Sequence, residues 1–335
     1  MGVFAGWDMP ISYAGTLAEH EAVRERVGLF DVSHLGKIGV RGDGSAALLD
    51  RVLSNRFGDL TPGRARYTLM LTSNAGIVDD IIVYAFVDGE YLVVPNASNV
   101  DEVERRMREH AGDVGVAQLP RVTIAVQGPR SEEVLAQVLP DLPDLGYMRC
   151  ALLGDVGVAR SGYTGERGFE VFADAEQGAK LWDALLEAVR DAGGEPCGLA
   201  ARDTLRLEMG YPLHGSDIDT DTTPREAHLD WAVATSKDDF IGKDAYVSRP
   251  PRKELIGIKM EDRVIPRHGA TVVQGGRSLG TVTSGTFSPT LKIGIALAYV
   301  EPGSLPEGEK VEIELRGKRG VGRVTHPPFV GRSPK

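Results

Sequence analysis

The chain has 335 residues and a formal net charge of -10, with 42% hydrophobic and 26% charged residues. This acidic balance excludes a general nucleic-acid-binding surface, because contact with phosphates needs a basic face. No apolar run approaches the roughly 20 residues that a membrane helix requires, and the N-terminal residues show no secretory or transit pattern. We therefore expect a cytoplasmic protein of two or three packed units, with neither nucleic acid nor membrane as a partner.

The cysteine and histidine patterns limit the chemistry. Cys150 and Cys197 are far apart and form no CxxC pair, which favours free thiols in a reducing compartment. The seven histidines include no HExxH motif and no His/Cys cluster, so the sequence predicts no metal site. The GVGR segment at 320–323 lacks the third glycine and the helix of a dinucleotide-binding fingerprint, which indicates a hairpin instead.

Helix and strand patterns alternate through the first half of the chain. Apolar residues at helical spacing predict helices at 15–28, 43–55, 99–112 and 129–139. Extended patterns predict strands at 65–73, at 121–128 and, as a pair, within 74–98. The Asp88-Gly89 dipeptide is a strong signal for a tight turn between the paired strands.

The same pattern returns in the second half. A strand pair is predicted within 156–173, followed by helices at 175–194 and 201–210. Two rounds of strand pairs and helices indicate an α+β body made of two related lobes.

Composition changes at 248–254, where the segment SRPPRKE has the character of a linker. Short strands separated by Gly-rich turns follow it, a pattern typical of a small β-barrel or sandwich. We therefore expect two domains, an α+β body over 1–249 and a C-terminal β-barrel over 253–330.

Several polar residues stand in apolar or glycine-bounded contexts. Asp79 and Asp80 lie side by side just before the apolar run IIVYAFV, where an aspartate ordinarily closes a turn. Asn96 ends the second strand of the same pair. Glu170 interrupts GFEVF, although a strand glutamate more often points to solvent. Arg202 lies in GLAARDTLRLE, where a surface ion pair is the ordinary alternative.

From these residues alone, the sequence predicts a cleft that contains at least two unusual carboxylates and an arginine. Tyr67, Tyr147 and Tyr163 are candidates for its walls. Aromatic rings can cover the faces of a flat polar heterocycle, carboxylates can accept from its N–H groups, and a guanidinium can bind an acid tail.

A set of ordered motifs then identifies a family. They are FAGWDMPISY (4–13), VGLFDVSHLGKIGV (27–40), NAGIVDDIIVY (74–84), RSGYTGERGFEV (160–171), CGLAARDTLRLEMGYPLHGSDID (197–219) and GTVTSGTFSPTLKIGIALAYV (280–300). Together they resemble the T-protein of the glycine cleavage system, an aminomethyltransferase family. The resemblance extends over essentially the whole chain.

The resemblance implies a fold, a reaction and a partner. The expected fold is a folate-binding α+β body followed by a small β-barrel, arranged like a cloverleaf around a central cleft. The expected reaction takes the one-carbon unit from aminomethyl-dihydrolipoyl H-protein to tetrahydrofolate, releases ammonia and forms 5,10-methylenetetrahydrofolate. Tetrahydrofolate is then the co-substrate, the lipoylated H-protein is the partner, and no metal is needed.

The resemblance also assigns roles to single residues. The family's catalytic aspartate matches Asp80, which leaves Asp79 to the turn. Its pterin-contacting glutamate matches Glu170, and its folate-binding arginine matches Arg202. Four further positions of the family's folate cleft match Tyr67, Asn96, Tyr147 and Tyr163.

The chain departs from the family pattern at some positions. Family members often carry tyrosines near the C-terminus, whereas this chain ends in FVGRSPK, with Arg332 as a possible substitute contact. His214 stands where the family often has tyrosine.

Two alternative functions remain open. One is a tetrahydrofolate-dependent demethylase that acts on another small donor. The other is a non-catalytic, folate-binding iron–sulfur maintenance protein. Proteins of that second kind carry a K-G-C-Y-x-G-Q motif, and the nearest segment here, 236–246, lacks its cysteine.

Overall fold

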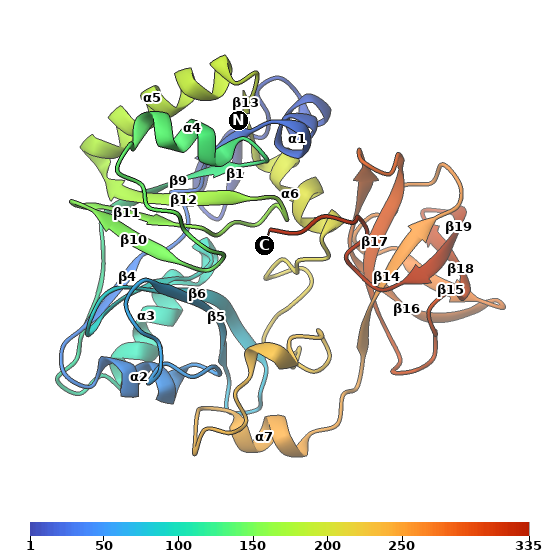
Figure 1. The fold of residues 1–335 in the computed structure, drawn as a ribbon. Helices are drawn as coiled ribbons and strands as arrows, with labels where there is room; N and C mark the ends of the chain where they lie inside the picture. Colours follow the sequence, from blue (N-terminus) through green and yellow to red (C-terminus); the bar gives the residue numbers. More distant parts are fainter. Residues whose placement is uncertain (335) are drawn as a thin grey trace.

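The computed structural model describes residues 1–334. It comprises a short N-terminal hairpin, two α+β lobes and a β-barrel that stands beside them (Figure 1). The hairpin pairs β1 (Gly2–Phe4) with β2 (Trp7–Met9). The predicted fold class, an α+β body followed by a small barrel, is confirmed. No helix within these residues is both long and apolar enough to span a bilayer.

The first lobe is an antiparallel sheet of five strands in the order β5-β6-β7-β4-β8. Its strands are β4 (Ile38–Arg41), β5 (Arg64–Leu71), β6 (Ile77–Val87), β7 (Glu90–Val94) and β8 (Gly115–Gln118). Helices α2 (Ser45–Val52) and α3 (Val100–Glu109) cover one face, where Val103 and Met107 enter the core. The Asp88-Gly89 turn joins β6 to β7 as predicted.

A β-bulge in the first lobe decides where the aspartates lie. Met70 pairs with Asp79 and Leu71 pairs with Ile77, so Val78 is an extra residue in β6. A bulge bends the strand and redirects side chains near it. Asp79 and Asp80 therefore belong to the paired part of the strand and not to a turn.

The second lobe is a six-stranded sheet in the order β10-β11-β12-β9-β3-β13. Its strands are β3 (Gly28–Asp31), β9 (Arg121–Gln127), β10 (Cys150–Leu153), β11 (Val156–Ala159), β12 (Gly168–Asp174) and β13 (Glu195–Pro196). Its helices are α1 (Thr16–Glu25), α4 (Ser131–Val138), α5 (Ala175–Asp191) and α6 (Leu199–Glu208). Because β3 pairs with β9, the start of the chain belongs to this lobe, and the two lobes interleave in sequence.

The two sheets meet through their inner faces. Tyr84 of β6 and Phe172 of β12 share one apolar cluster, with ring centroids 5.1 Å apart. Backbone bonds also join the lobes, since Ala65 N–H donates to Met148 O (2.9 Å). Because the sheets are in contact, Asp80 of β6 and Glu170 of β12 line the same cavity.

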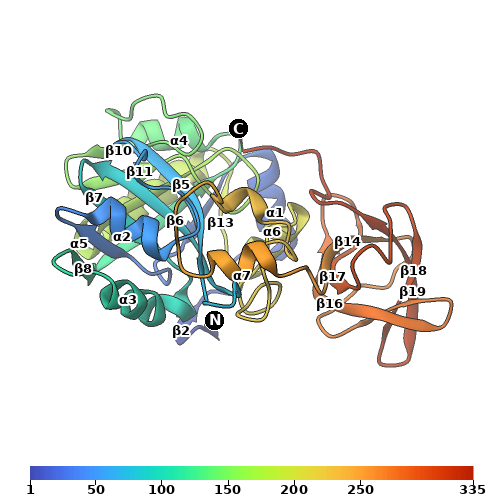
Figure 2. The same ribbon diagram turned by 90° about the horizontal axis from the view of Figure 1, so that it is seen from below.

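The closed barrel has the strand order β14-β17-β16-β15-β18-β19. Its strands are β14 (Glu254–Met260), β15 (Thr271–Gln274), β16 (Arg277–Ser288), β17 (Ile293–Val300), β18 (Lys310–Leu315) and β19 (Lys318–Thr325). Helix α7 (Lys243–Ser248) precedes the crossing from body to barrel, which Figure 2 shows. The domain limits 1–249 and 253–330 remain a prediction.

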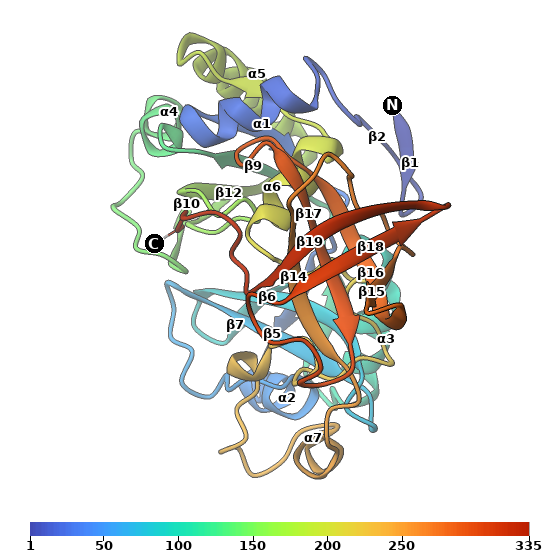
Figure 3. The same cartoon turned by 90° about the vertical axis from the view of Figure 1, so that its right-hand side faces the viewer.

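The barrel docks on α6, and Figure 3 shows it in front of the two lobes. The Arg206 guanidinium donates to Asp217 (2.7 Å) and to Ser284 of β16 (2.9 Å). After β19 the chain returns to the body, where Phe329 N–H donates to Glu208 O (2.8 Å). These contacts fix α6, and with it Arg202, between the lobes and the barrel.

Candidate active site

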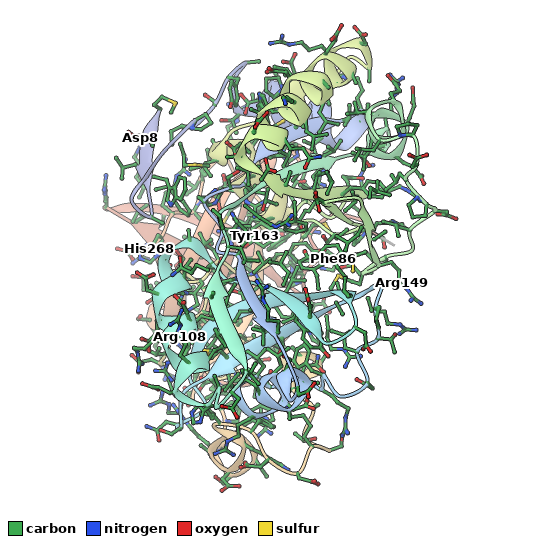
Figure 4. The ribbon with its side chains drawn as sticks, turned by 90° about the vertical axis from the view of Figure 1, so that its left-hand side faces the viewer. Asp8, Phe86, Arg108, Arg149, Tyr163 and His268 are labelled. Carbon is green, nitrogen blue, oxygen red and sulfur yellow. The ribbon has the colours of Figure 1, made fainter. Side chains whose placement is uncertain are left out.

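A cavity of about 1130 Å³ lies where the two sheets, α6 and the segment 209–214 meet. This volume exceeds the range of about 300–1,000 Å³ that is usual for small-molecule sites. The predicted site residues that line it are Tyr67, Asp80, Asn96, Tyr147, Tyr163, Glu170 and Arg202. Figure 4 shows one of them, Tyr163, near the middle of the molecule, whereas Arg108 lies at its edge.

The aspartate pair corrects one expectation. Asp79 is 0% exposed, and it belongs to no turn because it pairs with Met70 and strand pairing continues beyond the bulge at Val78. Its two oxygens accept from the backbone N–H of Asn96 (2.9 Å) and from the side-chain amides of Asn96 (2.8 Å) and Asn99 (2.7 Å). Asp79 is therefore a buried member of the site's hydrogen-bond network.

Asp80 lines the cavity and shares a donor with its neighbour. Asn96 Nδ2 donates to Asp80 Oδ1 (2.7 Å) as well as to Asp79, and the Tyr67 hydroxyl donates to Asp80 Oδ2 (3.1 Å). Burial raises the pKa of Asp80 above its ordinary value. Burial and the adjacent Asp80 charge raise the pKa of Asp79 as well, because two carboxylates so close together resist ionising together.

Glu170 lies on β12 and is only 7% exposed, so it does not point to solvent. Its Oε2 accepts from the hydroxyls of Tyr84 (2.7 Å) and Ser161 (2.5 Å). Its Oε1 has no hydrogen-bond partner within residues 1–334, and the residue lines the cavity. One carboxylate oxygen is thus held in place while the other remains free to accept from a ligand.

Arg202 projects from α6 over an aromatic ring. Its guanidinium carbon lies 4.7 Å from the centroid of Tyr163, a cation–π contact. Tyr163 in turn donates from its hydroxyl to Pro212 O (2.5 Å), which fixes the ring. The Arg202 guanidinium forms no hydrogen bond or ion pair with any described residue, and burial lowers its pKa. A partly dehydrated cation without an ion-pair contact suits an anionic ligand group.

Aromatic residues form two walls of the cavity. Trp231, of the turn η2 (Asp230–Ala232), stacks on Tyr67 with ring centroids 4.9 Å apart and planes at 27°. Tyr147 also lines the cavity and is exposed at 36%.

Arg332 does not line the cavity. Its guanidinium donates to Glu25, the last residue of α1 (3.1 Å), and lies 3.6 Å from Glu166. Two acidic residues therefore hold this cation in place, and the geometry gives no support to the expected substitute contact of Arg332.

Sequence reasoning missed several residues of the site. They are Tyr84, Asn99, Ser161 and Trp231. A signal existed for Tyr84, because Asp80, Ile82 and Tyr84 follow the two-residue period of a strand and all line the cavity. Trp231 lies far from Tyr67 in the sequence, and no local pattern links the two residues.

His214 also lines the cavity. Its Nδ1 lies 3.0 Å from the Asn99 amide nitrogen, and its Nε2 lies 3.3 Å from Ile77 O. Within residues 1–334 no group of three or more His, Cys, Asp or Glu side chains is arranged to hold a metal ion. Whether the reaction needs a metal stays a prediction.

The fold is that of a protein with a large cavity between two α+β lobes and a barrel. Residues 1–237 match the family model of the GCVT N-terminal domain, and residues 253–331 match that of the glycine cleavage T-protein C-terminal barrel domain. The chain therefore belongs to the glycine cleavage T-protein family, which confirms the resemblance found in the sequence.

Relatives agree with this family over nearly the full length. An aminomethyltransferase of Mycobacterium avium (strain 104) is 45% identical over 339 residues, covering 98% of this chain and 92% of the relative. An aminomethyltransferase of Frankia alni is 45% identical over 348 residues, covering 100% and 95%. The crystal structure of glycine cleavage system aminomethyltransferase T from Bartonella henselae superposes with a TM-score of 0.93 at 37% identity, covering 99% of this chain and 94% of that one.

Proposed function

We propose that this chain is the aminomethyltransferase of a glycine cleavage system. It transfers the one-carbon unit from aminomethyl-dihydrolipoyl H-protein to tetrahydrofolate, with release of ammonia and formation of 5,10-methylenetetrahydrofolate. The observation that carries the proposal is that two carboxylates from different sheets, Asp80 and Glu170, face one cavity together with the unpaired Arg202. Family membership over the whole chain supports the same reaction.

The groups of the cavity suit a reduced folate. The free Oε1 of Glu170 is an acceptor for the N–H edge of a pterin ring, and the Tyr84 and Ser161 hydroxyls hold that carboxylate in position. The Arg202 guanidinium is available for polar or acidic parts of the folate. The aromatic walls can cover the faces of a flat ring.

Asp80 is the catalytic residue in this proposal. The carbon exchanges its bonds to the donor's amine and sulfur for bonds to two folate nitrogens, whose N–H protons leave with ammonia and the thiol. Cationic iminium character develops on the carbon as ammonia leaves. A carboxylate fixed beside it by Asn96 and Tyr67 stabilises that charge and orients the attacking nitrogen. Because burial raises the pKa of Asp80, the carboxylate is also a stronger base than an exposed aspartate.

The partner and the location follow from the same reaction. The donor is a lipoyl arm carried by the H-protein, and the cavity of about 1130 Å³ exceeds the usual range for a single small-molecule site. We place the enzyme in the cytoplasm. Tetrahydrofolate acts as co-substrate, and the chemistry on carbon requires position and charge from the protein.

The direct test measures methylenetetrahydrofolate and ammonia after mixing the purified chain with aminomethylated H-protein and tetrahydrofolate. We expect both products in equal amounts. A parallel reaction replaces the H-protein with a small methylamine or sulfonium donor and should give no product. Turnover with the small donor and none with the H-protein would contradict the proposal in favour of a demethylase.

A further inference from the structure

The two aspartates of β6 are adjacent, but only Asp80 lines the cavity. The proposed reaction uses Asp80 and leaves a second carboxylate buried directly beside it. Burial of a carboxylate without a cationic partner is costly, and no Lys or Arg of residues 1–334 forms an ion pair with either aspartate. Asp79 therefore needs an explanation beyond packing.

Hydrogen bonds distinguish the two carboxyl groups. The three partners of Asp79 are all N–H donors, two from Asn96 and one from Asn99. With the amides in this orientation, a proton on Asp79 would replace at least one of these three bonds. The environment therefore favours Asp79 as the carboxylate anion.

The environment of Asp80 accommodates both of its protonation states. Its Oδ1 accepts from Asn96 Nδ2, and its Oδ2 lies 3.1 Å from the Tyr67 hydroxyl. A hydroxyl can donate to a carboxylate or accept from a carboxylic acid. Of the groups that the described residues bond to the pair, this hydroxyl is the one that can change from donor to acceptor in place.

We infer that Asp79 is a positioning residue for Asp80: it remains the buried anion of the pair and so directs their shared proton to Asp80 Oδ2, beside the cavity and Tyr67. The inference rests on the proposed role of Asp80 in the transfer. Asp80 then gains and loses its proton closer to neutral pH than an isolated aspartate does, which suits a group that works on reacting nitrogens.

Asn99 extends the network to His214. The Asp79 carboxylate fixes the amide nitrogen of Asn99 toward itself, and the same nitrogen lies 3.0 Å from His214 Nδ1. His214 Nδ1 must therefore accept, which puts the imidazole proton on Nε2, beside Ile77 O at 3.3 Å. In this arrangement His214 Nδ1 accepts from Asn99 and so orients the amide that donates to Asp79.

The titratable groups that face the pair are His214, Tyr67 and Tyr163. Burial raises the pKa of Tyr67 and of Tyr163 above the ordinary tyrosine value, so both stay neutral over the range in which the aspartates titrate. Neither tyrosine therefore exchanges a proton with the aspartate pair over that range.

The test follows the carboxyl groups by carbon-13 NMR in protein labelled at aspartate, without substrates, so that it does not depend on turnover. Asp79→Asn removes the neighbouring charge, and we expect the titration midpoint of Asp80 to fall by about one pH unit or more. Asn99→Ala removes one donor from the Asp79 anion, which favours a proton on Asp79. We therefore expect the Asp80 carboxyl signal alone to titrate with the first proton of the pair in the wild-type chain, and the Asp79 signal to titrate with it in Asn99→Ala.

Asp101→Asn is the matched control, because Asp101 is an exposed carboxylate two residues beyond Asn99 that accepts only from Gln118. It should leave both midpoints in place. If Asp79→Asn fails to fold, the carboxyl signals of the wild-type chain and of Asn99→Ala decide the question. A first proton that appears on Asp79 in the wild-type chain, or an Asp80 midpoint that stays unchanged in Asp79→Asn, would overturn the inference and leave Asp79 a structural residue.

The acidic limb of the pH–rate profile provides the functional readout. We expect it to move down with the NMR midpoint in Asp79→Asn. A lower maximal rate with an unmoved limb would reject the positioning role. If the wild-type chain transfers nothing from aminomethylated H-protein, the proposed function fails, and the NMR titration still decides whether Asp79 controls the proton on Asp80.

Discussion

Two strands, β6 and β12, carry buried carboxylates at or beside the cavity, and the surroundings of these carboxylates differ. On β6, Asp79 and Asp80 are adjacent, share Asn96 and have raised pKa values because both are buried. On β12, Glu170 stands alone, and two hydroxyls hold one of its oxygens while the other remains free. On β6 the protonation of each carboxylate is coupled to that of its neighbour. On β12 the orientation of the single carboxylate is fixed by two hydrogen bonds.

The difference separates chemistry from recognition. A coupled pair changes its protonation over a range set by both members, which suits a reaction in which charge develops and disappears. A single carboxylate with hydroxyl donors has little freedom to move and presents an acceptor of fixed direction, which suits recognition of N–H groups. Substitutions on β6 should therefore alter rate and pH dependence, whereas those on β12 should alter folate affinity.

The largest effect is expected from Asp80→Asn, which removes the charge at nearly constant shape. We expect a normal fold and a loss of turnover of about 100- to 1,000-fold, the range for removal of one preorganised electrostatic contact. Single-turnover transfer from aminomethylated H-protein at saturating tetrahydrofolate measures it. Equal rates for wild type and Asp80→Asn would remove Asp80 from the reaction and erase the contrast between the two strands.

Glu170→Ala should act on binding instead. Loss of a charge-assisted hydrogen bond costs about 1.5–3 kcal/mol, so we expect tetrahydrofolate to bind roughly 10- to 100-fold more weakly. The hydroxyls of Tyr84 and Ser161 lose their acceptor in the same variant.

Calorimetric titration of the folded Glu170→Ala variant with tetrahydrofolate, and separately with the H-protein, tests this assignment. The affinity for the H-protein should stay the same. An unchanged folate affinity would place Glu170 outside the binding site, whatever its burial.

Much of the architecture was predictable from local patterns. The Asp88-Gly89 turn, the long helix α5 and the short strands of the barrel all follow from turn signals and apolar periodicity. The interleaving of the lobes was not predictable, because β3 pairs with β9 at a separation of about ninety residues that no local rule specifies.

The candidate site was predictable only in part, because some of its residues follow local patterns and others meet only through non-local pairing. Asp80, Glu170 and Arg202 were found from their unusual contexts and from family motifs. Asp79 was misassigned, since the bulge at Val78 changes the register between β5 and β6 and is not visible in the sequence. Its partner Asn99 lies beyond the end of β7 and meets it only in the folded sheet.

A smaller effect on rate is expected from Asp79→Asn. The new side chain keeps one acceptor and adds a donor, so one of the N–H groups of Asn96 or Asn99 loses its partner. The orientation of Asn96, and through it that of Asp80, should relax. We expect turnover at neutral pH to fall about tenfold, in line with one lost hydrogen bond. A loss as large as that of Asp80→Asn would mean that both carboxylates act directly.

The smallest effect is expected from Tyr67→Phe, which keeps the ring that stacks on Trp231 and removes only the hydroxyl at Asp80 Oδ2. The bond from Tyr67 favours the ionised form of Asp80 and lowers its pKa, against the larger raising effect of burial. Its removal should raise the Asp80 pKa further. Since the ionised form is the active one, activity is lost as pH falls through this pKa, and the acidic limb should move to higher pH.

The turnover of Tyr67→Phe should therefore fall only a fewfold at high pH, about what a single hydrogen bond is worth, and more strongly as the pH is lowered. Rate measurements from acid to mildly alkaline pH, at saturating tetrahydrofolate, separate the two effects. The corresponding change on the other wall, Tyr84→Phe, removes a hydroxyl from Glu170 and should weaken folate binding without moving the acidic limb. If Tyr84→Phe moved the limb as far as Tyr67→Phe, the two carboxylate sites would titrate together, and the division between a reacting strand and a recognising strand would be wrong.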